Sequence, residues 1–356
     1  MRKLLAILVI TLSSLALVTA MNQGFINRIK QDRYFDHLRP GNEQISTLYR
    51  QLFIRSDRWG YGDLYGICYL PEYRLKLAPF EVYHYDKNDS PSANRVLYIV
   101  GDSFTADKIM DHAFAGFARV IFLDRRFPFG PVTPDPTKQN YLIMEFSELN
   151  ISNYASKNSF EISSRAAIPV FRPLPLLTRL GNILFNKELN RNIELLLFDD
   201  KIFTPFKAWK GSLNYTLFNR LPPEVTVSSD KKRLLLNSTV SFSSKQSVFK
   251  PMTDPEVGKI VTDLSADRDR YLSLGFKQVF LSLIPNAVSV YDDKRAPYNH
   301  LIERIEARVT FPVIPVYTLF KNDSRNLYSR SDAHWNPAGF GVWVRESNRV
   351  LNSNIR

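Results

Sequence analysis

The chain alternates short apolar runs with segments of helical periodicity, and this alternation restricts the folds that it can form. Apolar runs of this length are typical of parallel strands covered by helices on both faces. The runs are Val96–Val100, Arg119–Leu123, Tyr141–Phe146, Gln278–Ile284 and Pro312–Tyr317. We therefore expect an α/β fold in which a parallel sheet lies between two helical layers.

Helix boundaries are marked by the residues that usually begin and end helices. Asp254-Pro255 supplies an N-cap and a proline at the first helical position, and Gly275 marks the end of the same segment. Pro297 is expected to open another helix, and Asn336-Pro337 predicts a third near the C-terminus. These helices separate or follow the last predicted strands, as a doubly wound sheet requires.

Three segments are expected along the chain, which has 356 residues and 44% hydrophobic content. Residues 1–22 form an export segment, residues 23–92 form a lead-in region that packs on the main domain, and residues 93–356 form the α/β domain. Residues 151–253 separate the third and fourth strands by more than an ordinary crossover, and we expect this insertion to shape substrate access. Within it, Val225–Val227 and Leu234–Leu236 predict a hairpin.

The N-terminus has the composition of an export segment. Met1-Arg2-Lys3 is followed by a run from Leu4 to Ala20 that is apolar apart from a few Ser and Thr residues. Val18-Thr19-Ala20 fits the small-residue pattern of a cleavage site, yet the run is nearly long enough to span a bilayer. We expect an exported, periplasmic or otherwise extracytoplasmic protein, either soluble after cleavage or anchored by this segment.

The formal net charge of the chain is +12. Such an excess attracts anionic partners, which for an exported protein are acidic polysaccharide, lipid headgroups or wall polymer rather than nucleic acid. An even spread of Lys and Arg over a solvated surface explains the same charge. The densest cluster, Lys231-Lys232-Arg233, lies between two apolar runs and is typical of a hairpin turn.

The number and spacing of cysteine and histidine residues limit the kinds of functional site that the chain can contain. Cys68 is the single cysteine, so an intrachain disulfide is excluded, and we interpret it as a small buried side chain rather than a catalytic thiol. The histidines outside the C-terminal motif occur singly, without metal-ligand spacing. They are His37, His84, His112 and His300. We expect no metal and no cofactor.

Two short motifs carry the chemistry. Gly101-Asp102-Ser103 ends the first strand, where a sharp turn exposes the serine hydroxyl and its N–H can hold an oxyanion. Asp332-Ala333-His334 follows the last strand and supplies a base with a carboxylate two residues away. Neutral imidazole can take the Ser103 proton, and the carboxylate fixes the tautomer and stabilises the imidazolium. The sequence predicts a catalytic triad of Ser103, His334 and Asp332.

The predicted triad is consistent with the predicted sheet. Ser103 and His334 both follow strands, so they meet at the carboxyl edge where doubly wound sheets bind ligands. Asn150, at the end of the third strand, shares that edge and is either an oxyanion donor or a residue that satisfies its own turn. Asp102 is expected to stabilise the nucleophile turn.

The motifs resemble those of the SGNH hydrolase superfamily. Gly101-Asp102-Ser103-Phe104 with Asp332-Ala333-His334-Trp335-Asn336 is most similar to the branch that contains the alginate O-acetylation proteins AlgJ and AlgX. The resemblance implies a three-layer α/β/α, flavodoxin-like fold. It also implies an exported polysaccharide as acceptor and an integral-membrane acyltransferase as acetyl donor.

The resemblance extends to a third segment. Tyr141–Asn150 resembles a strand that ends in Glu-Arg in many relatives, and Leu149 stands where the arginine is usual. Glu148 and Trp335 are therefore candidates, with Asn150, for oxyanion or substrate binding. Pro285-Asn286-Ala287 lies where relatives often have Pro-x-Lys, so no lysine role is transferred.

The sequence favours an enzyme that transfers an acyl group, above all acetyl, through an acyl-enzyme on Ser103. Transfer to a sugar hydroxyl and hydrolysis by water require the same residues, so an O-acetyltransferase and an acetylesterase both remain open. The alternative is a carbohydrate-binding or assembly protein that keeps the SGNH fold with little turnover. The survival of all three triad residues favours the enzyme.

Overall fold

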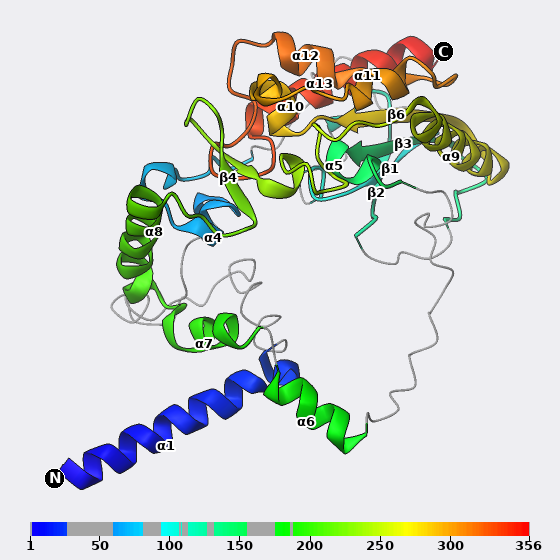
Figure 1. Cartoon of the computed structure of the whole chain (residues 1–356). Helices are drawn as coiled ribbons and strands as arrows, with labels where there is room; N and C mark the ends of the chain where they lie inside the picture. Colours follow the sequence, from blue (N-terminus) through cyan, green and yellow to red (C-terminus); the bar gives the residue numbers. More distant parts are fainter. Residues whose placement is uncertain are drawn as a thin grey trace. The chain divides into compact units, whose positions relative to one another are not determined.

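The computed structural model describes residues 2–26, 60–80, 94–106, 108, 113–126, 132–154, 175–185 and 188–355 (Figure 1). The chain forms two compact units. One contains residues 1–59 and 169–219, and the other contains residues 60–168 and 220–356. Much of the predicted lead-in region, residues 23–92, lies outside the described residues.

The second unit is built on a five-stranded parallel sheet with strand order β2-β1-β3-β6-β7. The strands are β1 (Arg95–Gly101), β2 (Arg119–Asp124), β3 (Gln139–Ser147), β6 (Phe276–Ile284) and β7 (Val313–Ile314). The predicted α/β class and parallel sheet are therefore confirmed.

Helices cover both faces of this sheet (Figure 1). Alternate β1 side chains point to opposite faces. Leu97 and Ile99 belong to one apolar core with α10 (Ala287–Tyr291), α12 (Val316–Asn322) and α13 (Pro337–Asn354). Val96 and Val100 belong to the other core, with α9 (Asp254–Ser273) and α11 (Leu301–Glu306). The arrangement is consistent with three α/β/α layers.

The last predicted strand is wrong in length. The Pro312–Tyr317 run contributes only Val313–Ile314 to the sheet, and α12 begins at Val316. Pro315 separates the two elements. Because proline has no N–H to donate to a ladder, it ends the strand, and it occupies the N-cap position of the helix.

Helix boundaries agree with the sequence at some positions and differ at others. Asn336 caps α13 by accepting from the Gly339 N–H at 3.0 Å, as expected. The cap of α9 is Thr253 instead of Asp254, because Thr253 forms a capping box with Glu256. Pro297 opens no helix, and α11 begins only at Leu301.

The remaining elements of the second unit are short. The predicted hairpin is present as antiparallel β4 (Val225–Val227) and β5 (Leu234–Leu236). Two helices have four residues each, α4 (Tyr65–Cys68) and α5 (Glu148–Ile151). Turns of 3-10 helix lie at Pro71–Tyr73, Asn237–Thr239 and Asp293–Arg295.

The first unit is helical in its described part. It contains α1 (Arg2–Met21), α6 (Leu176–Leu184), α7 (Leu189–Phe198), a 3-10 turn (Lys201–Phe203) and α8 (Thr204–Phe218). By length and composition α1 can cross a membrane, and a signal sequence passes the same test. The predicted 151–253 insertion is thus divided, since 169–219 cluster with the N-terminal segment and 220–253 with the sheet.

One buried polar pair in the sheet unit should be measurable. The Trp343 indole N–H donates to Ser282 Oγ at 2.9 Å, and both residues are fully buried. Ser282→Ala leaves this N–H without an acceptor and should lower the free energy of unfolding by about 1–3 kcal/mol. Chemical denaturation of Ser282→Ala, Trp343→Phe and the double variant tests this. If the two single losses add fully, the hydrogen bond contributes nothing.

Candidate active site

Ser103 lies in a tight turn directly after β1. The Thr105 and Ala106 N–H groups donate to the Asp102 carbonyl at 3.3 and 3.0 Å, which closes the turn. Gly101 enters it where a side chain cannot fit, because an added Cβ would lie 2.4 Å from Thr105 Oγ1. Of the residues that follow this turn, 107 and 109–112 lie outside the described part of the chain.

The Asp102 carboxylate fastens this turn to the end of β3. Its Oδ1 accepts from the Phe104 N–H at 3.0 Å, and its Oδ2 accepts from Ser147 Oγ and Asn150 Nδ2 at 2.8 Å each. Asp102 is buried, and its two oxygens are used by hydrogen bonds within the fold. It therefore stabilises the turn, as the sequence indicated.

Glu145 on β3 also stabilises this turn through hydrogen bonds. Its Oε2 accepts from the Asp102 N–H and from Thr105 Oγ1, each at 2.9 Å. Burial, with the Asp102 charge adding to it, raises the pKa of Glu145 to about 8. This raised pKa favours the protonated form of the carboxyl group, in which it adds no second negative charge beside Asp102.

Ser103, His334 and Asp332 form one continuous hydrogen-bonded chain. Ser103 Oγ lies 2.8 Å from His334 Nε2, and His334 Nδ1 lies 2.7 Å from Asp332 Oδ1. Both distances are within the range of a serine-base-carboxylate arrangement. The structure thus brings together the three residues that the sequence selected from positions more than two hundred residues apart.

Trp335 holds the histidine loop against the nucleophile turn. Its indole N–H donates to the Phe104 carbonyl at 2.9 Å, and its ring packs edge-on to the Phe104 ring. Trp335 is 1% exposed and does not line the cavity described below. The structure therefore places this substrate-binding candidate in a packing position beside the triad.

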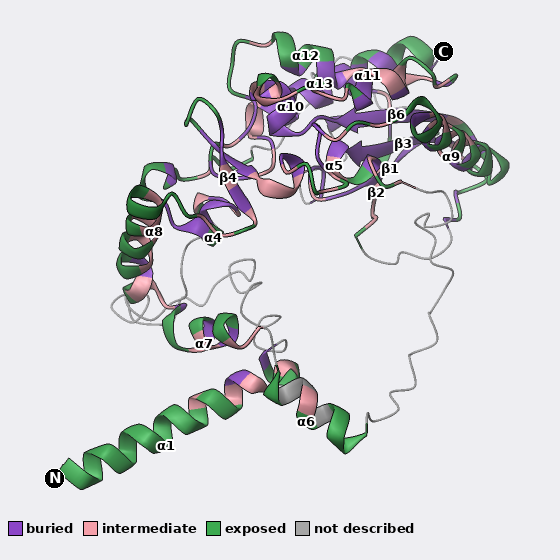
Figure 2. Ribbon diagram, in the orientation of Figure 1, coloured by how far each residue is buried: buried purple, intermediate pink, exposed green. Residues whose placement is uncertain are grey.

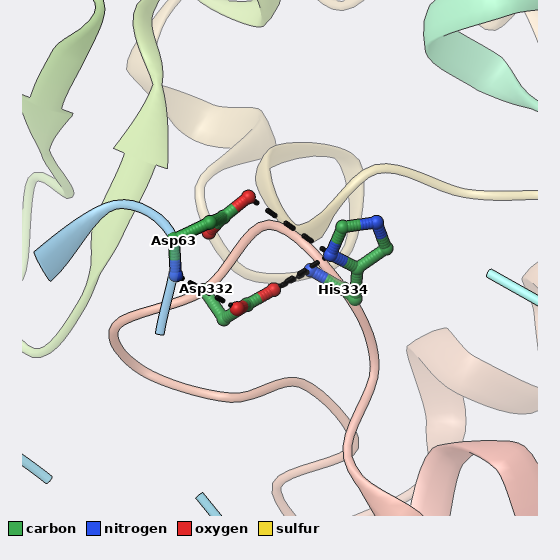
Figure 3. A group of neighbouring side chains, drawn as sticks. All are labelled: Asp63, Asp332 and His334. Carbon is green, nitrogen blue, oxygen red and sulfur yellow. Dashed lines mark hydrogen bonds and ion pairs between the residues drawn. The ribbon is translucent and has the colours of Figure 1, made fainter. Parts of the chain in front are cut away.

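Asp63, which the sequence analysis did not select, is a second carboxylate beside the histidine (Figure 3). Its Oδ2 lies 3.9 Å from His334 Nδ1, and its Oδ1 accepts from the Ala333 N–H at 2.9 Å. Its own N–H donates to Asp332 Oδ2 at 2.9 Å. Asp63 therefore holds both sides of the Asp332–His334 loop.

The approach of Asp63 depends on Gly62. Gly62 has a φ of +103°, and an added Cβ would lie 2.2 Å from the Ser331 carbonyl oxygen. The Tyr65 N–H donates to that same carbonyl at 3.1 Å. Gly60 and Gly62 flank Tyr61 in the sequence. No local pattern predicts that this segment contacts a loop 269 positions further along the chain from Asp63.

Three charged groups act on His334. Burial disfavours its protonation, but the hydrogen bond and charge of Asp332, with the charge of Asp63, outweigh burial and raise the pKa of His334. Lys108 opposes them. Burial and the nearby Asp332 charge raise the pKa of Asp63 to about 7, whereas hydrogen bonds and the charge of His334 overcome burial and lower the pKa of Asp332. Asp332 is the group poised to remain ionised.

Asp63, Asp332 and His334 are also close enough together to be considered as metal ligands. His334 Nδ1 and Asp332 Oδ1 are 2.7 Å apart, the distance of a direct charge-assisted hydrogen bond. His334 Nε2 is engaged by Ser103. The donor set therefore fits a proton relay better than a metal site.

A cavity of about 180 Å³ opens beside Ser103 and His334. Its apolar lining comes mainly from the β5 strand and from the start of α10, and includes Leu149 beside them. The lining residues are Asp63, Ser103, Phe104, Ser147, Leu149, Asn150, Leu234, Leu235, Leu236, Thr239, Asn286, Ala287, Val288, Ala333 and His334. From the predicted insertion, β5 of the hairpin and Thr239 in the turn that follows it line this cavity.

Three groups around the cavity have N–H hydrogens that can donate a hydrogen bond to a ligand oxygen. Ser103 N–H has no acceptor within the described part of the chain. Asn286 Nδ2 is buried and likewise lacks an acceptor there. Asn150 Nδ2 donates one hydrogen to Asp102, which leaves its second hydrogen, and Asn150 lies on α5 rather than in a loop.

Glu148 lies behind the cavity and does not line it. It is 1% exposed and accepts from the Asn286 N–H at 2.8 Å and from Tyr298 Oη at 3.1 Å. Burial raises its pKa to about 7 despite these hydrogen bonds. The structure gives Glu148 the position of a support for Asn286, not of a residue that contacts substrate.

Comparison of the chain with models of protein families, with curated proteins and with solved structures found no match in any of the three.

Asp63→Asn tests whether this carboxylate acts on His334. Removing its charge should lower the pKa of His334, so the acid limb of kcat/KM should move to lower pH, by up to about one unit. Asp332 and Lys108 stay in place as the other charges near the ring. An acid limb that does not move would show that Asp63 has no electrostatic effect on the histidine. Asp63→Glu is the matched control that keeps the charge.

Proposed function

We propose that this protein is a serine-dependent acyltransferase or esterase that uses Ser103, His334 and Asp332. The single observation that carries the proposal is the continuous hydrogen-bonded chain from Ser103 Oγ through both nitrogens of His334 to Asp332 Oδ1. A cavity begins at Ser103, so the hydroxyl has space for an ester beside it.

The chemistry follows the order of these contacts. Ser103 Oγ attacks the ester carbonyl carbon while His334 Nε2 takes its proton, and Asp332 stabilises the imidazolium. The carbonyl oxygen becomes negative and is received by N–H donors, for which the Ser103 N–H, Asn150 and Asn286 are the candidates. The C–O bond to the leaving group breaks, and His334 returns the proton to that oxygen.

The second half reaction distinguishes a transferase from an esterase. His334 removes a proton from the acceptor hydroxyl, whose oxygen attacks the acyl-enzyme carbonyl. The bond between the acyl carbon and Ser103 Oγ breaks, and His334 returns the proton to Ser103. If the acceptor is a sugar hydroxyl, the product is an O-acylated polysaccharide, and if it is water, the product is a free acid. The motifs resemble those of the SGNH hydrolases and of the AlgJ and AlgX branch, which supports acetyl transfer to an exported polysaccharide, and the net charge of +12 favours an acidic one. An integral-membrane acyltransferase is the corresponding acetyl donor.

Site variants test the serine mechanism with a chromogenic acetate ester. Ser103→Ala and His334→Ala should each lower kcat/KM by about three orders of magnitude or more, and the double variant should lose little beyond either single one. Ser331→Ala, next to the motif, is a control outside the proton path. Wild-type levels in Ser103→Ala would contradict the proposal, and a folded but inactive wild-type protein would favour the carbohydrate-binding alternative.

The apolar lining predicts selectivity for the acyl chain. Ala287, at the start of α10, lines the same cavity as Ser103, so Ala287→Phe fills part of this cavity. We expect kcat/KM for a butyrate ester to fall by about tenfold more than for the acetate ester. The acetate ester in the same variant is the internal control for folding. Equal losses on both esters would show that acyl groups do not enter this part of the cavity.

A further inference from the structure

Helix α8 of the first unit exposes a row of large apolar side chains. Phe206 is 67% exposed, Trp209 66% and Leu217 65%, and with Leu213 they recur at i, i+3, i+7 and i+11. This spacing places them on one side of the helix. Single exposed apolar residues are ordinary, but a continuous stripe indicates a surface that contacts another phase or molecule.

Helix α6 of the same unit repeats this feature. Leu176, Leu177 and Leu184 are exposed by 70%, 81% and 64%. Figure 2 shows α6, α8 and α1 largely in the colour of exposed residues. The first unit therefore combines a membrane-length apolar helix with two shorter helices whose apolar sides are also uncovered.

The C-terminal end of α1 is built into this unit. Ala20 is fully buried, and the buried Asn192 of α7 donates its side-chain N–H₂ to the Ala20 carbonyl at 2.9 Å and to Gln23 Oε1 at 3.0 Å. Cleavage after Ala20 would remove the first of these acceptors and leave one N–H of the buried Asn192 amide without a hydrogen bond. The packing therefore favours retention of α1 over its removal as a signal peptide.

Helix α8 contacts α7, the helix whose Asn192 hydrogen-bonds to the end of α1. Lys207 Nζ of α8 lies 3.2 Å from Asp199 Oδ1 at the end of α7, and both side chains are mostly buried. Phe198 and Phe203 form an edge-on ring pair at 5.3 Å between α7 and the turn that leads into α8. The apolar stripe is thus connected through α7 to the end of α1.

The direction of α1 fixes on which side of a membrane this end lies. Its 20 residues span about 30 Å, the thickness of the hydrocarbon core. Arg2 and Lys3 before the apolar run are the positively charged start of an export segment, and in that orientation the N-terminus stays in the cytoplasm and Ala20 lies at the outer surface.

The composition of α8 suits a lipid surface. The helix contains two lysines, Lys207 and Lys210, and no acidic residue. Lys210 is exposed beside the stripe, where its stem can lie along the apolar surface while its ammonium group reaches lipid phosphates. Trp209 is of the residue type that is enriched at membrane interfaces.

We propose that α1 is a retained membrane anchor and that α8 lies along the outer surface of the same bilayer, with Phe206, Trp209 and Leu217 inserted among the lipids. The occupant of the stripe is therefore a phospholipid surface with anionic headgroups. The proposal rests only on the first unit and does not depend on catalysis at Ser103.

Site-directed fluorescence tests the lipid contact in the full chain. Cys68 is buried and is the only cysteine, so Trp209→Cys and Leu217→Cys each introduce one accessible thiol for an environment-sensitive dye. Leu272→Cys on α9 of the sheet unit is the matched control, because this leucine is also exposed, at 38%. Each protein is reconstituted into phosphatidylethanolamine and phosphatidylglycerol vesicles containing a nitroxide-labelled lipid.

The expected result is blue-shifted emission and loss of intensity by the nitroxide at positions 209 and 217, with neither effect at 272. Water-like emission at all three positions would overturn the proposal. Protection from an aqueous quencher without nitroxide quenching would overturn the lipid as occupant and show that protein covers the stripe. The intact mass of the membrane-extracted protein should include residues up to Ala20, and a mature N-terminus at Met21 would overturn the retained anchor.

Discussion

The proposed chemistry depends on the close contact between the turn that carries Ser103 and the loop that carries His334. The Trp335 indole donates to the Phe104 carbonyl, so a single hydrogen bond joins the residue after the nucleophile to the residue after the base. Around this contact, Asp102 and Glu145 fix the first segment to β3. The serine and histidine meet at 2.8 Å because both segments are held by groups that take no part in catalysis.

Asp63 acts on the same site through its charge, which affects the protonation of His334. Two carboxylates face one imidazole, and only Asp332 directly accepts a hydrogen bond from it. Two carboxylates this close disfavour each other's ionisation, so the pKa of Asp63 rises, while hydrogen bonds and the charge of His334 lower the pKa of Asp332. Asp63 therefore takes up a proton more readily than Asp332, which stays ionised beside the histidine.

The sequence was informative where local chemistry decides the structure. Apolar runs predicted the strands, and Asn336-Pro337 predicted the start of α13, because both signals depend on neighbouring residues. The strand predicted over Pro312–Tyr317 was wrong in length. An apolar run alone does not show that Pro315 divides it into a two-residue strand and the start of a helix. Ser103, Asp332 and His334, which the two motifs contain, lie within hydrogen-bonding distance of one another in the structure.

Other features depend on contacts between distant segments and had no local signal. Asp63 reaches the site only because Gly62 allows the backbone to approach Ser331, and Glu148 was proposed to contact substrate although burial places it behind Asn286. The division of the 151–253 insertion between two units likewise arises from tertiary contacts, among them the one between Asn192 and Ala20.

The most direct measurement is mass spectrometry of the protein after treatment with a fluorophosphonate, which forms a stable bond only with an activated serine. We expect one adduct per chain, located on the peptide that contains Ser103 and strongly reduced in His334→Ala. No adduct on a folded protein, an adduct on another residue, or equal labelling without His334 would contradict the claim that Ser103 is activated by this histidine.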